Sequence, residues 1–465
     1  MRNGRIWGLL LAVLMLVLLC GGCKETNNQE AQLLLESEGT QWYCGFGIST
    51  IELPENDEPL YIAGYNNGME ISEVRDLCQA RAVWLDTGAE GVLLIGIDCV
   101  ALDSGTVAKI RASLVDIPNC AGIQVYSTHT HGGVDTLGLW GPVGIDGKNS
   151  GYQQKLIKAA DAAGREAVAR RTGGKLYYGA VDTAGMYRDS RDPQVYDSNL
   201  YQLRFSPENG NPGMRMYFYG AHAEALRGAN SRLSRDYPGL LCDGVTEATG
   251  DQAIFFPGAI GGLIMTKAFV PDADSGPGAE ENLLITGEKL VEYALSIEQE
   301  IAVAPRVKLS RVEFTVALDN PVFLLYRLLG ILNNRAVKAE SATGYGVRTE
   351  LSVLLLDGIG LCLMPGEIFP ELVYGGSLQP EMDPMPLVKM AEAYGVEQLL
   401  VVGLSNDEIG YIVQPSDFMI NEQMPYLERI LDIKGEDHYE ETNSVGPECA
   451  QEVASAFEKA LRALG

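Results

Sequence analysis

The sequence predicts an α/β fold, with a mixed sheet that carries helices on both faces, in one large domain. Two observations lead to this prediction. Apolar runs of strand length alternate along the chain with longer segments of helical spacing, and such alternation is typical of α/β architectures. Beyond residue 40 we find no linker rich in Pro, Gly or Ser and no internal repeat. We therefore expect a single catalytic domain over residues 41–465.

The individual elements follow from this patterning. Residues 91–98 form an almost continuous apolar run, which is typical of a strand buried on both faces. Further strands are expected at 122–126, 216–220, 351–356, 361–364 and 399–404, and helices at 106–115, 152–171, 282–301 and 449–464. Several polar clusters fall where these strands end, which is where open α/β sheets place their ligands.

One apolar segment, 321–332, is interrupted by Arg327 and is too short to span a bilayer. A core helix is the first interpretation. The alternative is an exposed apolar lid or interfacial contact that helps a lipid substrate to enter.

Residues 1–23 predict a targeting segment. Arg2 and Arg5 precede an apolar run, and Gly21-Gly22-Cys23 resembles a bacterial lipobox. We expect cleavage that leaves Cys23 as a lipid-bearing N-terminus. Ordinary signal cleavage nearby and a retained membrane anchor are the alternatives. Residues 24–40 are polar and are expected to form a flexible tether, so the protein is predicted to be exported and anchored to a membrane.

The charge and the cysteine content exclude several classes of function and of site. The net charge of −27, from 62 acidic and 35 basic residues, argues against nucleic-acid binding and against docking on anionic lipid through a basic surface. Seven of the nine cysteines follow Cys23 without any Cys-x-x-Cys pair. This spacing argues against a structural zinc knuckle.

Two of the four histidines, His129 and His131, stand one residue apart just beyond a predicted strand. Because strand side chains alternate with a period of two, both rings are expected on the same side. A third histidine, His222, also follows a predicted strand. Glu367 after Pro365-Gly366 offers a carboxylate, and Tyr411 offers a phenolate or a hydrogen bond. These residue types are those of zinc sites, but spacing alone does not bring them together.

Several short motifs, taken in order, resemble the neutral/alkaline non-lysosomal ceramidase family. Members of this family are zinc-dependent hydrolases of the amide bond in N-acylsphingosine. The likeness is to their N-terminal catalytic domain and covers most of the mature chain. The motifs include Gly45-Phe46-Gly47-Ile48, Ala63-Gly64-Tyr65, Thr128-His129-Thr130-His131-Gly132, Arg191-Asp192-Pro193, Asn230-Ser231-Arg232, Pro365-Gly366-Glu367, Gly403-Leu404-Ser405-Asn406 and His438-Tyr439-Glu440.

The resemblance implies a Zn²⁺ site and a set of residue roles. The implied metal ligands are His129, His222, Glu367 and Tyr411. His131 corresponds to a catalytic histidine that moves the proton of water, and Tyr411 or Tyr439 would stabilise the oxyanion. Arg191 and Tyr439 correspond to groups that bind the substrate, although the Tyr439 match needs an insertion after Tyr411. Asp98, at a strand end, would either orient an imidazole or cap the strand.

One departure from the family bears on mechanism. The family serine falls on Ile264 and the preceding aspartate on Gly262, while Thr266 lies two positions further on. An isoleucine side chain cannot attack a carbonyl, so a serine-based acyl-enzyme is excluded at that position. The route left is attack by water that the metal activates.

Three functions therefore follow from the sequence. The first is an exported zinc-dependent hydrolase of a lipid amide such as N-acylsphingosine. The second is a metal hydrolase of the same fold that cleaves a different amide or ester. The third is a non-catalytic binding lipoprotein. In such a protein, replacement of a polar catalytic element by the apolar Leu263-Ile264 would be expected. Two imidazoles, a carboxylate and a phenolate suit zinc best among divalent ions.

Overall fold

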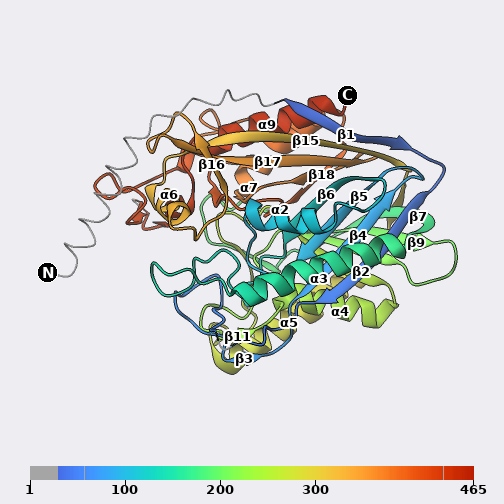
Figure 1. Cartoon of the computed structure of the whole chain (residues 1–465), viewed down its shortest axis with the longest axis horizontal. Helices are drawn as coiled ribbons and strands as arrows, with labels where there is room; N and C mark the ends of the chain where they lie inside the picture. Colours follow the sequence, from blue (N-terminus) through green and yellow to red (C-terminus); the bar gives the residue numbers. More distant parts are fainter. Residues whose placement is uncertain (1–29, 57, 433) are drawn as a thin grey trace.

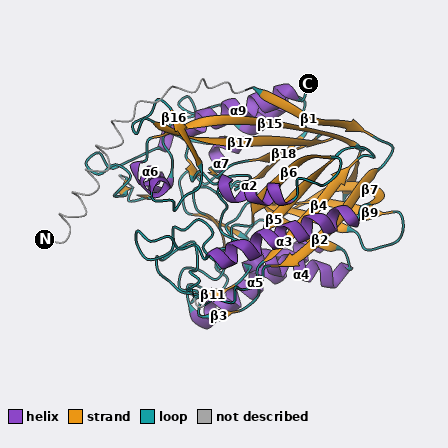
Figure 2. Ribbon diagram, viewed as in Figure 1, coloured by secondary structure: helices purple, strands orange, loops and turns teal. Residues whose placement is uncertain are grey.

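The structure, a computed structural model, describes residues 30–465 except residues 57 and 433. In this part of the chain, two large sheets pack face to face, and helices cover their outer sides (Figures 1 and 2). The predicted α/β class with mixed strand directions is confirmed. The strands divide into two sheets, which share an apolar layer, and the helices lie on the two outer faces.

The larger sheet has nine strands among the described residues, with a mixture of parallel and antiparallel pairs. Its order is β12 (Gln252–Pro257), β10 (Met214–Tyr219), β9 (Asn199–Pro207), β7 (Thr172–Asp182), β2 (Trp42–Thr50), β4 (Gln79–Asp86), β5 (Gly91–Ile97) and β6 (Cys120–Ser127), with β14 (Glu300–Val303) beside β7.

The second sheet has six strands within the described ranges. Its order is β1 (Ala31–Glu38), β15 (Arg306–Leu318), β17 (Tyr345–Leu356), β18 (Ile359–Leu363) and β20 (Gln398–Val402), with β16 (Arg335–Lys338) beside β17. Short pairs extend from the two sheets: β3 (Glu73–Val74) with β11 (Arg232–Leu233), β8 (Tyr187–Asp189) with β13 (Ile264–Thr266), β19 (Glu367–Ile368) with β21 (Tyr411–Ile412), and β22 (Ile430–Leu431) with β23 (Asp437–His438).

Helices cover each sheet on its outer side only, as Figure 1 shows for α9 above and α3 below. The nine-stranded sheet carries α2 (Ser104–Ser113), α3 (Ser150–Ala169), α4 (Asp236–Thr249) and α5 (Gly276–Leu295); the six-stranded sheet carries α7 (Pro370–Tyr374), α8 (Leu387–Ala393) and α9 (Cys449–Ala463); and α6 (Pro321–Leu328) follows β15. No helix in the described ranges has both the length and the apolar character needed to cross a membrane.

Alternating side chains explain the layers. In β5, Val92 and Leu94 pack in the core between the sheets, whereas Leu93 and Ile95 pack toward α2 and α3. This strand is fully buried on both faces, as its continuous apolar run predicts. The side chains of β17 also alternate between the layer that joins the sheets and the outer side, and Leu354 faces the other sheet.

Two expectations need correction. Residues 31–38, expected within the tether, form β1, which pairs antiparallel with β15. The physical reason is the run of leucines there: Leu35 is buried between the sheets. The helix expected over 282–301 begins earlier and ends at Leu295, and residues 300–303 form β14 instead. The signal segment and Cys23 lie outside the described residues.

The two sheets are joined at one end by backbone hydrogen bonds. The loop after β20 donates from Asn406 to the carbonyl of Val125 on β6, and Ser127 donates to Leu404. Gly403 donates to Pro257 at the end of β12. The carboxyl ends of β6, β10, β18 and β20 therefore meet in one region, which is where polar side chains of the two sheets converge.

Glu371 on α7 is a buried carboxyl group that predicts a pH effect on stability. Burial, with the nearby Asp189, Asp417 and Asp383, raises the pKa of Glu371 to about 8. At pH values between the pKa of Glu371 in the unfolded chain and this raised pKa, Glu371 is protonated in the folded protein and ionised in the unfolded chain. Stability is therefore expected to fall as pH rises from about 4.5 through 8. Glu371→Gln should remove this pH dependence, which lowers the stability by on the order of 4 kcal/mol at pH 8. Denaturant unfolding from pH 5 to 9 tests this, and an unchanged slope contradicts it.

Candidate metal centre

The loop after β6 carries the first two histidines. β6 ends at Ser127, and His129 has a left-handed φ of 62°. The backbone N–H of His131 donates to the carbonyl of Ala223 at 3.0 Å. The rings of His129 and His131 have centroids 4.7 Å apart. They converge as predicted, but through this turn and its contact with the segment after β10, not through strand alternation.

His222 follows β10 and lies against the same turn. Its backbone N–H donates to the carbonyl of Ile264 at 2.8 Å, and its ring nitrogen Nδ1 lies 2.9 Å from the same oxygen. The ring centroid of His222 is 4.9 Å from that of His129 and 5.7 Å from that of His131. The three histidines that follow predicted strands thus share one centre, where their ligand nitrogens lie within 4.8 Å of one another.

Glu367 and Tyr411 reach the site from the segments that follow β18 and β20 of the six-stranded sheet. They start the paired strands β19 and β21, where they are direct partners in the parallel register. The carboxylate oxygen Oε2 of Glu367 lies 3.1 Å from Nε2 of His222 and 3.4 Å from Nε2 of His129. The structure therefore brings the four predicted ligand residues together from opposite sheets.

The geometry of this group fits a cation of zinc size. Nδ1 of His129 lies 2.7 Å from the carbonyl of Val100, and Nδ1 of His222 faces Ile264. With their protons held there, both rings turn an Nε2 lone pair toward the common centre. Two ligands about 2.05 Å from a tetrahedral ion lie about 3.3 Å apart. The separations of 3.1 and 3.4 Å from Glu367 match this value.

The electrostatics favour positive charge at the centre. Burial raises the pKa of Glu367, but the charges and hydrogen bonds of His129 and His222 outweigh it and hold the pKa well below its usual range. Burial, followed by the two neighbouring imidazoles, lowers the pKa of His131 well below its ordinary value. For His222, the hydrogen bond and charge of Glu367 outweigh burial and raise the pKa. The site thus combines an ionised carboxylate with imidazoles that compete for a proton or a cation.

Three neighbours of His131 carried no assigned role in the sequence prediction. Glu224 Oε2 lies 3.6 Å from Nδ1 of His131, and it accepts a short hydrogen bond from the hydroxyl of Tyr65. Gly64 has φ +108°, and a Cβ there would lie 2.5 Å from the His131 ring. Glu224 stands two residues after His222, and Gly64-Tyr65 belongs to a motif of the resemblance. Neither position signals this contact without the fold.

Asp98 does not contact an imidazole. Its carboxylate accepts from the backbone N–H of Gln79 at 3.0 Å and from the hydroxyl of Thr128 at 3.1 Å. Of the two expected roles, the structure therefore supports the strand-end cap. This cap fixes Thr128, the residue before His129.

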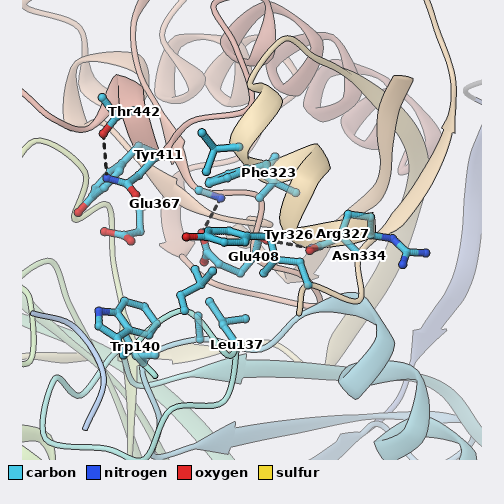
Figure 3. A pocket seen from close by; sticks show the side chains of 18 of the residues that line it. Leu137, Trp140, Phe323, Tyr326, Arg327, Asn334, Glu367, Glu408, Tyr411 and Thr442 are labelled. Carbon is cyan, nitrogen blue, oxygen red and sulfur yellow. Dashed lines mark hydrogen bonds between the residues drawn. The ribbon is translucent and has the colours of Figure 1, made fainter. Parts of the chain in front are cut away.

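A cavity of about 460 Å³ opens beside the histidines. Figure 3 shows Glu367 and Tyr411 on one side of it, Leu137 and Trp140 on another, and Phe323 and Tyr326 of α6 facing them. Within α6 only Leu324 is buried, whereas Leu328 is 52% exposed. The segment expected as a core helix therefore forms a wall of the cavity instead.

Tyr439 lies at the cavity, and Arg191 lies behind it. The hydroxyls of Tyr439 and Tyr411 are 3.3 Å apart, and both rings line the cavity. The guanidinium of Arg191 donates to both carboxylate oxygens of Glu440 and to the carbonyl of Asp437. It stands 5.6 Å from the centre of the Tyr439 ring. The structure thus places Arg191 against the segment of Tyr439, with its Nε and Nη2 donors engaged by Glu440 and Asp437.

Ile264 occupies β13 next to His222. Its side chain is buried, and its carbonyl is the acceptor for the His222 backbone and ring. Thr266, two residues on, is also buried. Ile264 therefore supports His222 through its backbone carbonyl, while its side chain is apolar.

We compared the chain with known proteins. No family model matches the sequence, and no curated protein matches it. Among solved structures, neutral ceramidase from Pseudomonas aeruginosa matches with a TM-score of 0.71 and 16% identity, covering 92% of this chain and 75% of that chain. The chain has a ceramidase-like fold. A ceramidase structure described as complexed with C2 matches with a TM-score of 0.69 and 16% identity, covering 91% of this chain and 75% of its own.

The ceramidase-like fold accounts for the convergence seen here. It brings the ends of β6 and β10 against those of β18 and β20, so that residues far apart in sequence meet. At 16% identity the likeness concerns the fold. The chemistry of the site is therefore argued from its own side chains.

Proposed function

We propose that this protein is a zinc-dependent hydrolase that cleaves an amide bond of a lipid such as N-acylsphingosine. The observation that carries the proposal is the convergence of His129, His222 and Glu367 with His131 at the wall of a largely apolar cavity. The ceramidase-like fold supports the choice of substrate class.

His129, His222 and Glu367 would hold the ion, with Tyr411 beside them as the fourth predicted ligand. When bound, zinc polarises a carbonyl oxygen and lowers the pKa of water to about 7. Burial, followed by the charge of Glu367, raises the pKa of the Tyr411 phenol well above its ordinary value. The phenol is therefore neutral unless a cation lies next to it.

The other residues of the cavity supply the remaining chemistry. His131 would accept the proton of the attacking water and return it to the leaving amine. Tyr439, whose burial raises its pKa, keeps its proton and donates a hydrogen bond to the oxygen on which negative charge develops. Leu137, Trp140 and Phe323 provide apolar contacts for a hydrocarbon chain.

A second candidate keeps the metal chemistry and changes the substrate. It is favoured by Ile264, because the buried apolar side chain removes a hydroxyl from the position where the resembled family has one. A different amide or an ester would then be cleaved. The third candidate, a binding lipoprotein without turnover, retains the same ligand set and cavity.

The deciding experiment measures metal content and hydrolysis in the same purified protein. We expect about one zinc per chain and release of fatty acid from short fluorescent N-acyl amides. Turnover of other amides or esters with ceramides untouched favours the second candidate. Tight lipid binding without turnover favours the third, and protein that binds no divalent metal contradicts the first two.

We also propose that the protein is exported and held to a membrane through lipid on Cys23, on the grounds of the Arg2, Arg5 and Gly21-Gly22-Cys23 pattern. Mass spectrometry of the N-terminal peptide tests this. A diacylglyceryl group on Cys23 is the expected result, and an unmodified residue at that position contradicts it.

A further inference from the structure

His131 differs from the other two histidines in what lies behind its ring. In His129 and His222, Nδ1 lies within hydrogen-bonding distance of a backbone carbonyl. In His131, Nδ1 has no hydrogen-bond partner and faces the carboxylate of Glu224 at 3.6 Å. A carboxylate is a stronger acceptor for a ring N–H than a carbonyl is.

Glu224 is held in this position by burial and by hydrogen bonds. It is 3% exposed, and its backbone N–H donates to the carbonyl of His222 at 3.0 Å. The hydroxyl of Tyr65 donates to Oε2 of Glu224. The other oxygen, Oε1, has no hydrogen-bond partner, and the nearest cation is Nη1 of Arg227 at 3.6 Å. A buried carboxylate with so few donors is costly unless another donor faces it.

The ring of His131 has a second contact in this arrangement. The Tyr65 ring packs edge-on to it, with centroids 5.1 Å apart and an interplanar angle of 72°. The backbone of Gly64 also lies close to the ring, since a Cβ there would be 2.5 Å from Cγ and Nδ1 of His131. Tyr65 therefore contacts both His131 and Glu224.

The two neutral forms of the ring can be told apart by these contacts. If the proton were on Nε2, the lone pair of Nδ1 would face the negative oxygen of Glu224, which is repulsive. If the proton is on Nδ1, a donor faces the carboxylate, and a shift of a few tenths of an ångström completes a hydrogen bond. The Nε2 atoms of His131 and His129 lie 3.1 Å apart, so a proton on Nε2 of His131 can be shared with His129 only while no ion engages the Nε2 lone pair of His129. With that lone pair bound to an ion, the Nδ1–H form leaves the Nε2 lone pair of His131 facing the reacting centre.

We infer that Glu224, supported by Tyr65, is a positioning residue that holds the proton of His131 on Nδ1 and thereby directs its Nε2 lone pair into the site. The placement of the proton rests on these contacts together with an ion that engages Nε2 of His129, as in the proposed function. Its use in proton transfer from water rests on the proposed function, and the two are tested separately.

Nitrogen-15 NMR of histidine-labelled protein tests the placement, because the chain has only four histidines. His131→Asn assigns the His131 signals, and metal content is measured on the same samples. We expect the Nδ1–H form of His131 in the wild type and in Glu224→Gln, whose amide oxygen still accepts. We expect this form to be lost in Glu224→Leu and kept in Glu371→Leu, a matched change of a buried carboxyl elsewhere. A spectrum of the zinc-loaded wild type with the proton of His131 on Nε2 overturns the inference.

Kinetics provide a second readout that general loss of structure would not produce. In zinc-loaded protein, Glu224→Leu should lower kcat by about 100-fold with little change in KM, and Glu224→Gln should recover much of this loss. In a His131→Ala background, Glu224→Leu should have no further effect, because its role passes through His131. Additive losses in the double variant overturn the positioning role. Metal-free wild type would instead contradict the proposed function.

Discussion

Replacing His222 with Asn is expected to abolish metal binding and hydrolysis together. An asparagine amide can still donate to the carbonyl of Ile264, as Nδ1 of His222 does, so the local backbone is preserved. The variant lacks the Nε2 atom that faces Glu367 at 3.1 Å. Metal affinity should fall by more than about 100-fold, because even residues that only support a ligand contribute 10–100-fold.

Metal analysis and thermal unfolding check this expectation. Added zinc should stabilise the wild type, by about 2.7 kcal/mol at 100 times its dissociation constant, and should leave His222→Asn unchanged. Stoichiometric zinc in the variant would show that His222 is not a ligand. Normal unfolding of the variant without metal would show that the fold itself is intact.

Replacing Gly64 with Ala is expected to remove activity while metal is retained. The new Cβ would lie 2.5 Å from Cγ and Nδ1 of His131, so the ring must move away from its place in the site. If His131 is the proton carrier, kcat should fall by about 10²–10⁴-fold, the usual contribution of general acid–base catalysis. The three atoms nearest to the new Cβ all belong to His131 and not to the predicted ligands His129, His222 and Glu367.

Gly68→Ala is the matched control for backbone strain. Gly68 also has a left-handed φ, +74°, but a Cβ there would have its nearest neighbour 3.9 Å away. Both variants should therefore lose about 1–2 kcal/mol of stability, and only Gly64→Ala should lose turnover. Equal loss of kcat in the two variants would mean that the effect arises from the backbone and not from His131.

Local patterns predicted much of the fold. The apolar run of β5 and the amphipathic spacing of α3 and α9 gave elements close to those observed, because burial on one or both faces dictates residue type directly. The division into two sheets was not predictable in this way. An apolar face that packs on another sheet and one that packs on a helix have the same composition.

The candidate site shows the same limit. His129, His131 and His222 were marked by their positions after strands, and resemblance linked them to Glu367 and Tyr411. Glu224 was missed because an isolated glutamate after a histidine carries no periodic signal. Arg191 was expected to bind substrate, yet it donates to Glu440, an acidic residue more than 200 positions later. Such pairs depend on tertiary contacts alone.

The centre takes ligands from both sheets: His129 and His222 follow β6 and β10, whereas Glu367 and Tyr411 follow β18 and β20. An ion held there would act as a cross-link across the apolar layer that joins the sheets. Its binding energy would then be available only while the two sheets remain together. Hydrogen exchange at the carboxyl ends of β6 and β20 should therefore slow in parallel when zinc is added, so that one small ion couples the opening of two large sheets.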